Sequence, residues 1–406
     1  MEQTGRDTVD NDKDTIISSK TNTASRNTVT IHTENKNDNV EVKLKDVNID
    51  GRSQNKAAVS VTGSGNTTIE LDGSNTLKSG SGHAGLEHNK TDTSGELTIQ
   101  DNDKNGSLKA AGGQFGAGIG GAGAANDAQV KITGGKITAT GGEYGAGIGG
   151  GFKGSGDVTI SGGEIHANGG NYGAGIGGGD YSSGKVTISG GEINATGGYL
   201  GAGIGGGGDK GSGDVTITGG EITSATGGKY GAGIGGGKEG RGDVTIEGNT
   251  EVNAAGGTGS AGIGGGYGAK NNSNSTGNQI TIRSNENGSP TVNAVGGGTK
   301  KGIADIGGAG IGTGCNSNAD TTITLEGKVT IKATAGKGNV AIGTNGNEQV
   351  FTGLAGGTSI TRKDSDKNDI PPLPGDNVPT PSGGDTAGGG STGGGSAGGD
   401  SAGGDS

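Results

Sequence analysis

Apolar and polar residues alternate along much of the chain in short runs that are separated by pairs of glycines. In one stretch the runs are DVTIS at 157–161, EIHAN at 164–168 and YGAGI at 172–176, with glycine pairs at 162–163 and 169–170. Strict alternation of apolar and polar residues is typical of a β-strand with one buried face. Each stretch of this kind therefore predicts three short strands joined by glycine corners.

The alternation also predicts which side chains face inward. The inward set is apolar and comprises Val158, Ile160, Ile165, Ala167, Ala174 and Ile176. The outward set comprises Thr159, Ser161, Glu164, His166 and Asn168. The following stretches repeat the inward set with Val186, Ile188, Ile193 and Ala195, then with Val215, Ile217, Ile222 and Ala225. The last of these carries one extra residue, Ser224, which predicts a β-bulge.

The pattern recurs at nearly constant intervals. The string GAGIGG occurs at 116–121, 145–150, 173–178, 201–206 and 231–236, and SAGIGG follows at 260–265. Weaker copies centre on Val59, Leu86, Ile306 and Ile342. A repeat that cannot bury its own apolar face is stable only when its neighbours stack on it. We therefore predict an all-β, parallel β-helix (solenoid) of about 10 coils of about 28–30 residues, with three short strands per coil. The crossover preference of parallel strands predicts right-handed winding.

The predicted solenoid covers residues 28–361. Residues 1–27 are polar without an apolar pattern, and we expect them to be disordered. Residues 362–406 should form a disordered tail, because IPPLP at 370–374 breaks regular structure and 382–406 has the composition of a flexible linker. Within GAGI the glycines alternate with inward residues, so they either leave a strand face of bare backbone or serve only for tight bending.

Composition excludes several classes of protein. Glycine occupies 102 of 406 positions and hydrophobic residues only 26%, which argues against a conventional globular core. The net charge of −11 argues against binding to nucleic acid or to anionic membranes. No apolar run is long enough for membrane insertion, and the single cysteine, Cys315, allows no internal disulfide. Residues 1–18 contain no apolar signal segment, so the chain is either intracellular or a mature or truncated piece of a longer protein, and we expect the latter.

Motifs of catalysis are weak. Each GAGIGG string fits a dinucleotide fingerprint, but no helix follows it. The histidines at 32, 83, 88 and 166 lack a zinc-ligand pattern, and we expect them on the surface. We therefore predict that the chain is not an enzyme. The enzymatic alternative, a polysaccharide lyase or hydrolase, would need a charged cluster in an irregular coil, and the irregular insert at 267–278 offers only Lys270.

Three columns of stacked side chains are candidates for binding. Glu164, Glu192, Glu221 and Glu251 should stack on one outward face, after Lys136, where they are either simply solvated or collect calcium. A second column precedes the GAGI strings and shares the alternation of the inward alanine, which predicts an inward, packed corner ladder, with a sugar-stacking strip as the alternative. Its members are Phe115, Tyr144, Tyr172, Leu200 and Tyr230. A third column consists of threonines, and regular threonine arrays occur in some ice-binding proteins, but the position two residues further on loses its regularity at Glu247 and Arg283. The threonines of this column are Thr159, Thr187, Thr216, Thr245 and Thr281.

The repeat unit, VTISGGEI followed by a TGG corner and YGAGIGGG, resembles repeats of large secreted or wall-attached proteins of Gram-positive bacteria. It is also similar to β-helix carbohydrate-binding proteins. The resemblance covers about residues 116–265. It implies an extracellular or cell-surface location and an adhesin-like, polysaccharide-binding role. The chain contains no sorting motif of the Leu-Pro-x-Thr-Gly type, so the resemblance leaves the mode of attachment open.

These observations lead to a functional hypothesis. We expect a non-catalytic scaffold that binds polysaccharide along a repeated polar face, with no cofactor except calcium if an acidic sugar must be bridged to the glutamates. The residues assigned to this face are Glu164, His166, Asn168, Glu192, Asn194 and Glu221. A passive spacer without a ligand is the main alternative.

Overall fold

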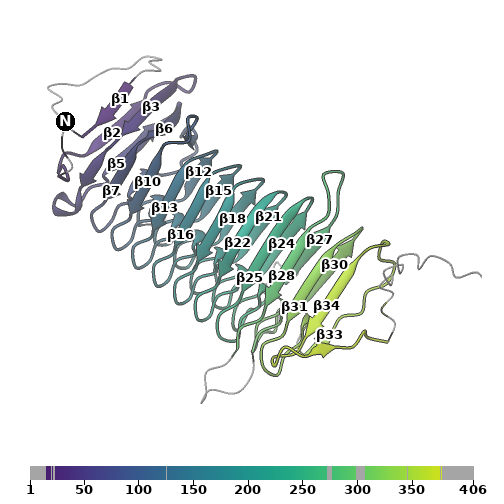
Figure 1. Ribbon diagram of the computed structural model, residues 1–406. Helices are drawn as coiled ribbons and strands as arrows, with labels where there is room; N and C mark the ends of the chain where they lie inside the picture. The colour runs from purple at the N-terminus through teal and green to yellow at the C-terminus, as the bar shows by residue number, and fades with distance from the viewer. Residues whose placement is uncertain are drawn as a thin grey trace, which may run out of the picture.

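The computed structural model describes residues 15–19, 21, 23–124, 126–271, 277–298, 307–344, 346–374 and 376. These residues form an elongated parallel β-solenoid in which three sheets run side by side along the whole rod (Figure 1). Each coil adds one strand to each sheet, and successive coils pair in parallel. The predicted all-β, three-stranded coil is therefore confirmed, with about eleven coils in place of the expected ten. The right-handed winding stays a prediction.

The strands are short, because a glycine corner interrupts the chain after most of them. The first sheet contains β1 (Thr15–Ser18), β3 (Asn39–Lys45), β6 (Asn66–Asp72), β9 (Leu97–Gln100), β12 (Ala128–Ile132), β15 (Gly156–Ile160), β18 (Gly184–Ile188), β21 (Gly213–Ile217), β24 (Gly242–Glu247), β27 (Asn278–Arg283) and β30 (Thr321–Glu326). The second sheet contains β4 (Asn48–Asp50), β7 (Ser74–Lys78), β10 (Ser107–Ala111), β13 (Lys136–Thr140), β16 (Glu164–Asn168), β19 (Glu192–Thr196), β22 (Gly220–Thr226), β25 (Thr250–Ala255), β28 (Thr291–Val295), β31 (Thr330–Thr334), β34 (Ser359–Lys363) and β35 (Asp369–Ile370).

The third sheet has the shortest strands. It contains β2 (Val29–Thr33), β5 (Val59–Gly63), β8 (Leu86–His88), β11 (Ile119–Gly120), β14 (Ile148–Gly149), β17 (Ile176–Gly177), β20 (Ile204–Gly205), β23 (Ile234–Gly235), β26 (Ile263–Gly264), β29 (Ile311–Gly312), β32 (Ile342–Thr344) and β33 (Asn347–Glu348). Helical structure among the described residues is limited to the 3₁₀ turn η1 (Arg52–Gln54), and no helix there is long and apolar enough to span a membrane.

The core consists of apolar ladders, as the alternation predicts. Val158, Ile165 and Ile176, one from each sheet, are completely buried and stack on their equivalents in the next coil. One anchor predicted from the sequence is wrong. The ladder position expected for Ile306 belongs to Ile311, which pairs with Ile263 and Ile342, while Ile306 itself lies outside the described residues. The cause is a longer connection before this strand, which shifts the register of the repeat.

The predicted bulge is present in β22. Asn194 pairs with Ser224, so the extra residue is Thr223 and not Ser224. The hydroxyl of Thr223 donates a hydrogen bond of 2.8 Å to the carbonyl of Ile193, which stabilises the bulge against the preceding coil.

The glycine face of the third sheet is not bare surface. Residues 145–151 are all buried, and a Cβ atom on Gly147 would lie 2.6 Å from the carbonyl oxygen of Gly175 in the next coil. Gly149 has φ +129°, which side-chain-bearing residues rarely adopt. The glycines therefore permit close stacking of backbones, and the turns at each end of the strand form the outer surface.

Both ends of the solenoid extend further than the composition predicts. Strand β1 pairs with β3, and Ser25 bridges to Ile49, so regular structure begins within the segment 1–27 that composition predicts to be disordered. At the other end, β34 and β35 lie at and beyond the expected boundary at 362. Backbone pairing with the neighbouring coil orders these polar segments. Residues 1–14 and 377–406 of the two predicted tails lie outside the described residues.

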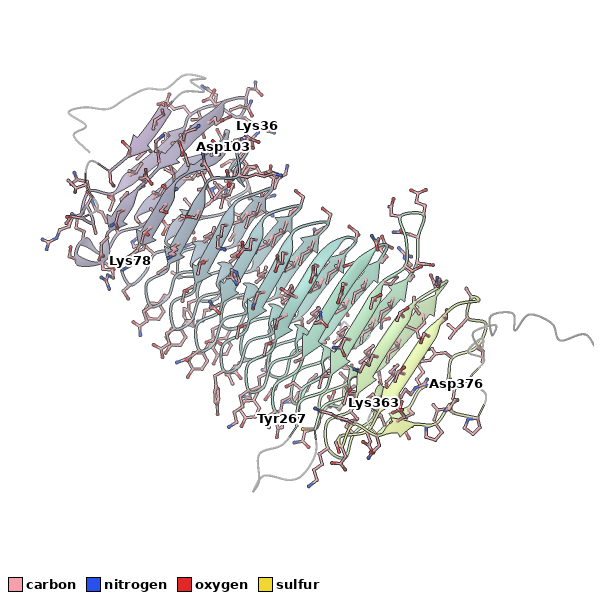
Figure 2. All side chains as sticks on the ribbon, in the orientation of Figure 1. Lys36, Lys78, Asp103, Tyr267, Lys363 and Asp376 are labelled. Carbon is pink, nitrogen blue, oxygen red and sulfur yellow. The ribbon has the colours of Figure 1, made fainter. Side chains whose placement is uncertain are left out.

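The C-terminal coil is closed by two reversals of strand direction. Strand β33 pairs antiparallel with β32, and β35 pairs antiparallel with β34. Arg362, which is only 3% exposed, joins these strands by ion pairs to Asp376 at 2.7 Å and to Glu348 at 3.5 Å. These elements form a cap on the last coil, near the labelled Asp376 in Figure 2.

Candidate functional site

The six residues assigned from the sequence lie together on the outward face of the second sheet. Strands β16, β19 and β22 carry them, and parallel register aligns Glu164 with Glu192 and Glu221, and His166 with Asn194. Asn168 continues as Thr196 in the next coil. The predicted alignment of these groups on one face is therefore present, with neighbouring strands about 4.8 Å apart. We call this surface the polar face.

The glutamates of the column differ in whether a cationic side chain lies beside them. Glu164 is half-buried and contacts Lys136 of the preceding coil at 2.5 Å and His166 at 3.1 Å. These contacts, Lys136 first, lower the pKa of the Glu164 carboxyl. Glu192, Glu221 and Glu251 are exposed, and the described part of the chain places no cation within salt-bridge distance of them. The acidic end of the column is thus open to a polar or cationic ligand.

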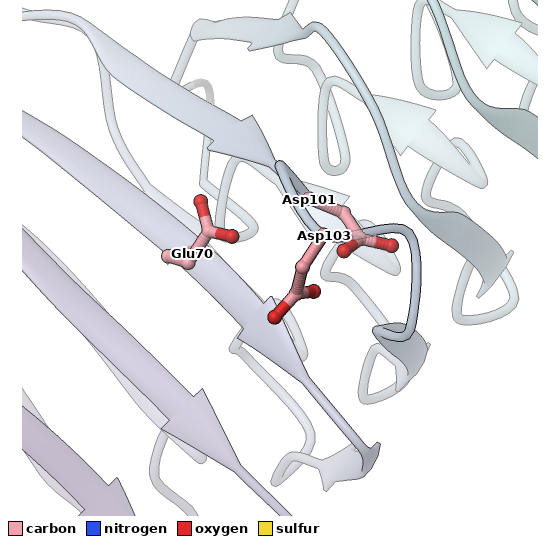
Figure 3. A group of neighbouring side chains, drawn as sticks. All are labelled: Glu70, Asp101 and Asp103. Carbon is pink, nitrogen blue, oxygen red and sulfur yellow. The ribbon is translucent and has the colours of Figure 1, made fainter.

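A different group of carboxylates could hold a metal ion. Glu70 on β6 faces Asp101 and Asp103, which come from the loop after β9 (Figure 3). One oxygen from each lies within 4.8 Å of the others, and this is the only such group among the described residues. The carboxylates of the glutamate column do not form such a group of three. The loop has the sequence DNDKNG at 101–106, the D-x-D-x-N-G spacing of calcium loops, and this short motif is the signal by which sequence reasoning could have found the group.

Hydrogen bonds already order this carboxylate group. Glu70 is 4% exposed and accepts bonds from the backbone and side-chain nitrogens of Asn102 at 2.9 and 2.8 Å. Asp101 accepts bonds from the backbone of Asn105 and Gly106, while burial raises the pKa of its carboxyl. The arrangement could accept a hard cation such as calcium through oxygen ligands.

Aromatic residues gather on one edge of the rod. All six tyrosines and two of the three phenylalanines of the chain lie in the two turns that flank the third sheet. The turn before the strand carries Phe115, Tyr144, Tyr172, Tyr199 and Tyr230, and the turn after it carries Phe152, Tyr181 and Tyr267. The two turns lie against each other, since the backbone N–H of Phe152 donates to the carbonyl of Phe115 at 2.8 Å. We call this surface the tyrosine edge, and Figure 2 marks Tyr267 on it.

The inward corner ladder predicted for the aromatic column is wrong for its aromatic members. Tyr144 and Tyr172 are only half-buried, and the buried member of this column is Leu200, at 6% exposure. Parity fails here because the residues lie in turns, where side chains do not alternate across a sheet. The rings of Tyr144 and Tyr172 stack at 5.0 Å with planes 7° apart, so their faces cover each other. Tyr199 and Tyr181 are the most open rings, at 49% and 57% exposure.

A buried carboxyl lies within the tyrosine edge. Asp180 is 3% exposed and accepts a hydrogen bond from the backbone N–H of Tyr181 at 3.1 Å. Burial, followed by repulsion from Asp209, raises the pKa of the Asp180 carboxyl to about 6. The neighbouring Asp209 forms an ion pair with Lys238 at 2.7 Å. The edge therefore combines aromatic rings with charged groups, an arrangement suited to ligand binding.

No histidine belongs to a group of three possible metal ligands among the described residues. The prediction that the histidines lie on the surface is wrong for His88, which is 2% exposed in β8 and contacts the carbonyls of Val61 and Gly95. Burial lowers the pKa of the His88 imidazole and favours its neutral form. His83 instead contacts Glu87 at 2.8 Å, and His166 belongs to the polar face.

An open groove follows the corner where the first-sheet strands begin. It has a volume of about 370 Å³ and is lined by Asp127, Ser155, Ser183 and Asp214, among others. Lys90 reaches Asp157 there at 3.2 Å. The stacked side chains are held by the backbone of the next coil, since the Ser183 hydroxyl accepts from the backbone N–H of Ser212 at 3.2 Å.

The repeat itself relates this chain to known proteins. A family model described as a beta helix repeat matches residues 130–152, 158–180, 186–208, 215–238 and 244–267. Each match begins on a first-sheet strand and ends in the turn after the third sheet. The five matched segments, which lie between residues 130 and 267, are thus similar to a β-helix repeat. No curated protein and no solved structure shows a significant match to it.

Proposed function

We propose that this β-helix is a non-catalytic, extracellular scaffold that binds a polysaccharide along its polar face. The supporting observation is the register of the second sheet, which repeats the same kinds of hydrogen-bonding side chain from coil to coil. A ligand with a repeating chemical structure matches a protein surface with a repeating structure. The β-helix repeat is compatible with such a surface or carbohydrate-related role.

The geometry favours a long ligand over a small one. The polar face is an open sheet surface, so no single coil encloses a sugar. Successive coils would each add a weak contact, and the contacts would be made within one complex, so that affinity grows with chain length. The exposed carboxylates of Glu192 and Glu221 would accept hydrogen bonds from sugar hydroxyls. An acidic sugar would need calcium between it and these carboxylates.

The decisive experiment is a binding series with neutral oligosaccharides of increasing length, measured by calorimetry with and without calcium. We expect affinity to rise with length, and joint replacement of Glu164, Glu192 and Glu221 by alanine to weaken binding. The melting temperature should change little, since these side chains are outward. Joint replacement of Thr159, Thr187 and Thr216 on the first sheet is the matched control, because they form an equally stacked outward column.

Two results would overturn the proposal. Absence of binding to plant, host and bacterial polysaccharides, with or without calcium, would favour the passive spacer. Release of shortened sugars from any of them would favour the lyase or hydrolase.

The tyrosine edge is the rival location for the same ligand, because sugars pack well on open aromatic rings. Its most open rings, Tyr181 and Tyr199, can be replaced together by alanine. If this variant loses oligosaccharide binding while the glutamate variant retains it, the site belongs to the tyrosine edge.

A further inference from the structure

A second candidate site, separate from the polar face, is a pocket in which three of the six lining residues are cationic. It has a volume of about 360 Å³ and is lined by Lys210, Ser212, Glu239, Arg241, Lys270 and Asn271. Three of these side chains are cationic and one is anionic, so the lining has a charge of 3 − 1 = +2. The whole chain has a net charge of −11, so a cationic pocket is a local exception on an acidic rod. We call it the basic pocket.

The groups of the basic pocket are held in place by their neighbours. The guanidinium of Arg241 donates to the carbonyl of Gly277 at 3.1 Å, and the backbone N–H of Arg241 bonds to Ser212 Oγ at 3.4 Å. Lys270 binds Glu239 at 2.8 Å. Lys210 lies in a tight turn with φ +70°, fixed by a backbone hydrogen bond to Lys238 at 2.7 Å. The pocket is therefore preorganised on stacked turns.

The anionic groups near the pocket are Glu239, Asp243 and Asp320, and Asp320 accepts a hydrogen bond from the side-chain amide of Asn271 at 3.0 Å. Lys270, through a direct hydrogen bond, and then Lys238 and Lys210 lower the pKa of the Glu239 carboxyl, because several positive charges surround it. Arg241 is balanced in part by Asp243, at 3.8 Å. The ammonium of Lys210 is exposed, and the described residues offer it no ion pair. Lys210 thus supplies the charge that is most available to an incoming anion.

An open aromatic ring accompanies this charge. Tyr181 is 57% exposed, and its backbone N–H donates to the carbonyl of Gly208 at 3.1 Å, in the turn that carries Lys210. A ring that can pack against a sugar therefore lies in the coil adjacent to cations that can bind an oxyanion.

We propose that the basic pocket binds the oxyanion of an acidic glycan, a sulfate or carboxylate, with the sugar extending toward Tyr181. This site is independent of the polar face, whose glutamates would repel the same ligand. Charge-assisted hydrogen bonds from Lys210 and Lys270 would hold the anion, and the Ser212 hydroxyl offers a neutral donor beside them.

The test uses three probes on the full chain, namely inorganic sulfate, a sulfated oligosaccharide and a uronic acid oligosaccharide, with calorimetric readout in low salt. Lys210→Gln and Lys270→Gln should each weaken binding by about five-fold, the size expected for loss of one partly exposed charge contact. Glu239→Gln should strengthen binding, because it removes the only anion of the lining. Lys109→Gln, at an exposed lysine on β10, is the control and should change nothing.

The probes also separate the possible sources of the anion. Tighter binding of either oligosaccharide than of inorganic sulfate, lost in Tyr181→Ala, supports a glycan. Equal binding of all three probes would overturn the proposal of a glycan ligand and would indicate a site for free anions. Equal losses of affinity in the Lys210→Gln and Lys109→Gln variants, or no gain of affinity in Glu239→Gln, would refute the proposal that the basic pocket binds the anion. None of these outcomes depends on binding of neutral sugars to the polar face, so the two proposals can fail separately.

Discussion

The buried carboxyl of Asp180, in the tyrosine edge, destabilises the folded protein when it is ionised. Its carboxyl is almost fully buried and lies near Asp209, and its pKa is raised to about 6 from an ordinary value of 3.8. A raised pKa in the folded chain means that ionisation is easier in the unfolded chain. The free-energy cost of burying the ionised Asp180 carboxyl is therefore absent below about pH 4, grows between about pH 4 and pH 6, and reaches its full size above about pH 6.

Asp180→Asn should therefore stabilise the protein at pH 8, by about 1–3 kcal/mol from the size of the pKa change. The amide oxygen can still accept the hydrogen bond from Tyr181. The gain should shrink toward zero as the pH falls to 4, which thermal melts across this range would reveal. Asp214→Asn, at an exposed position on β21, is the control. A gain that does not vary with pH would show that burial of the charge is not its cause.

Inward and outward positions should respond very differently to the same charge. Ile176→Asp buries an unpaired carboxylate in the isoleucine ladder of the third sheet and should cost several kcal/mol. Thr187→Asp, on the outward face of β18, should cost less than about 1 kcal/mol. Chemical denaturation of both variants checks this, and equal losses would refute the assignment of the two faces.

At the residue scale, the sequence predicts strand positions much better than turn positions. Inside β15 and β16, alternation alone identifies Val158 and Ile165 as core residues, because side chains on a strand point to opposite faces in turn. Tyr144 has no such constraint, since the turn conformation decides where its ring points. The same limit applies to Lys210 and Lys270 of the basic pocket, which are distant in sequence and meet only through the stacking of coils.

At the scale of elements, the coil is the unit of structure. Ile176 and Ile204 occupy equivalent positions in β17 and β20, so deletion of residues 177–204 joins Ile176 to Gly205 and recreates a normal junction. We expect a folded rod that is one coil shorter. Deletion of only the first half of this segment, 177–190, should instead unfold neighbouring coils, because inward and outward positions no longer align. Circular dichroism melts of both variants test this, and similar melting would show that the repeat boundaries are misplaced.

The capping elements are harder to predict than the repeats. Strands β1 and β35 are short, and their sequences carry no apolar alternation comparable to that of β15. Each is ordered by pairing with a neighbouring strand, β3 and β34 respectively, which only the structure reveals. Composition predicts tails in these segments because it measures what a segment can bury by itself.

At the scale of the whole molecule, the cap should keep the rods apart. The strands of an uncapped last coil would present unpaired backbone groups to another chain. Truncation after residue 361 removes β35 and the Arg362 ion pairs, and we expect such chains to associate end to end as concentration rises. Small-angle scattering should show one rod length for the full chain and longer rods for the truncated one. A truncated chain that remains a single rod at high concentration would show that the cap has no such role.

The near identity of the coils also has a consequence for heredity. Five copies of GAGIGG recur at almost constant spacing, and wherever the coding sequence repeats with them, the repeated stretches can mispair during recombination. In most proteins the gain or loss of so long a run of codons would destroy the fold. Here each such event adds or removes a complete coil, because every junction lies between equivalent isoleucine ladders. Rod length can therefore change between related genes in a single step, without passing through a misfolded intermediate.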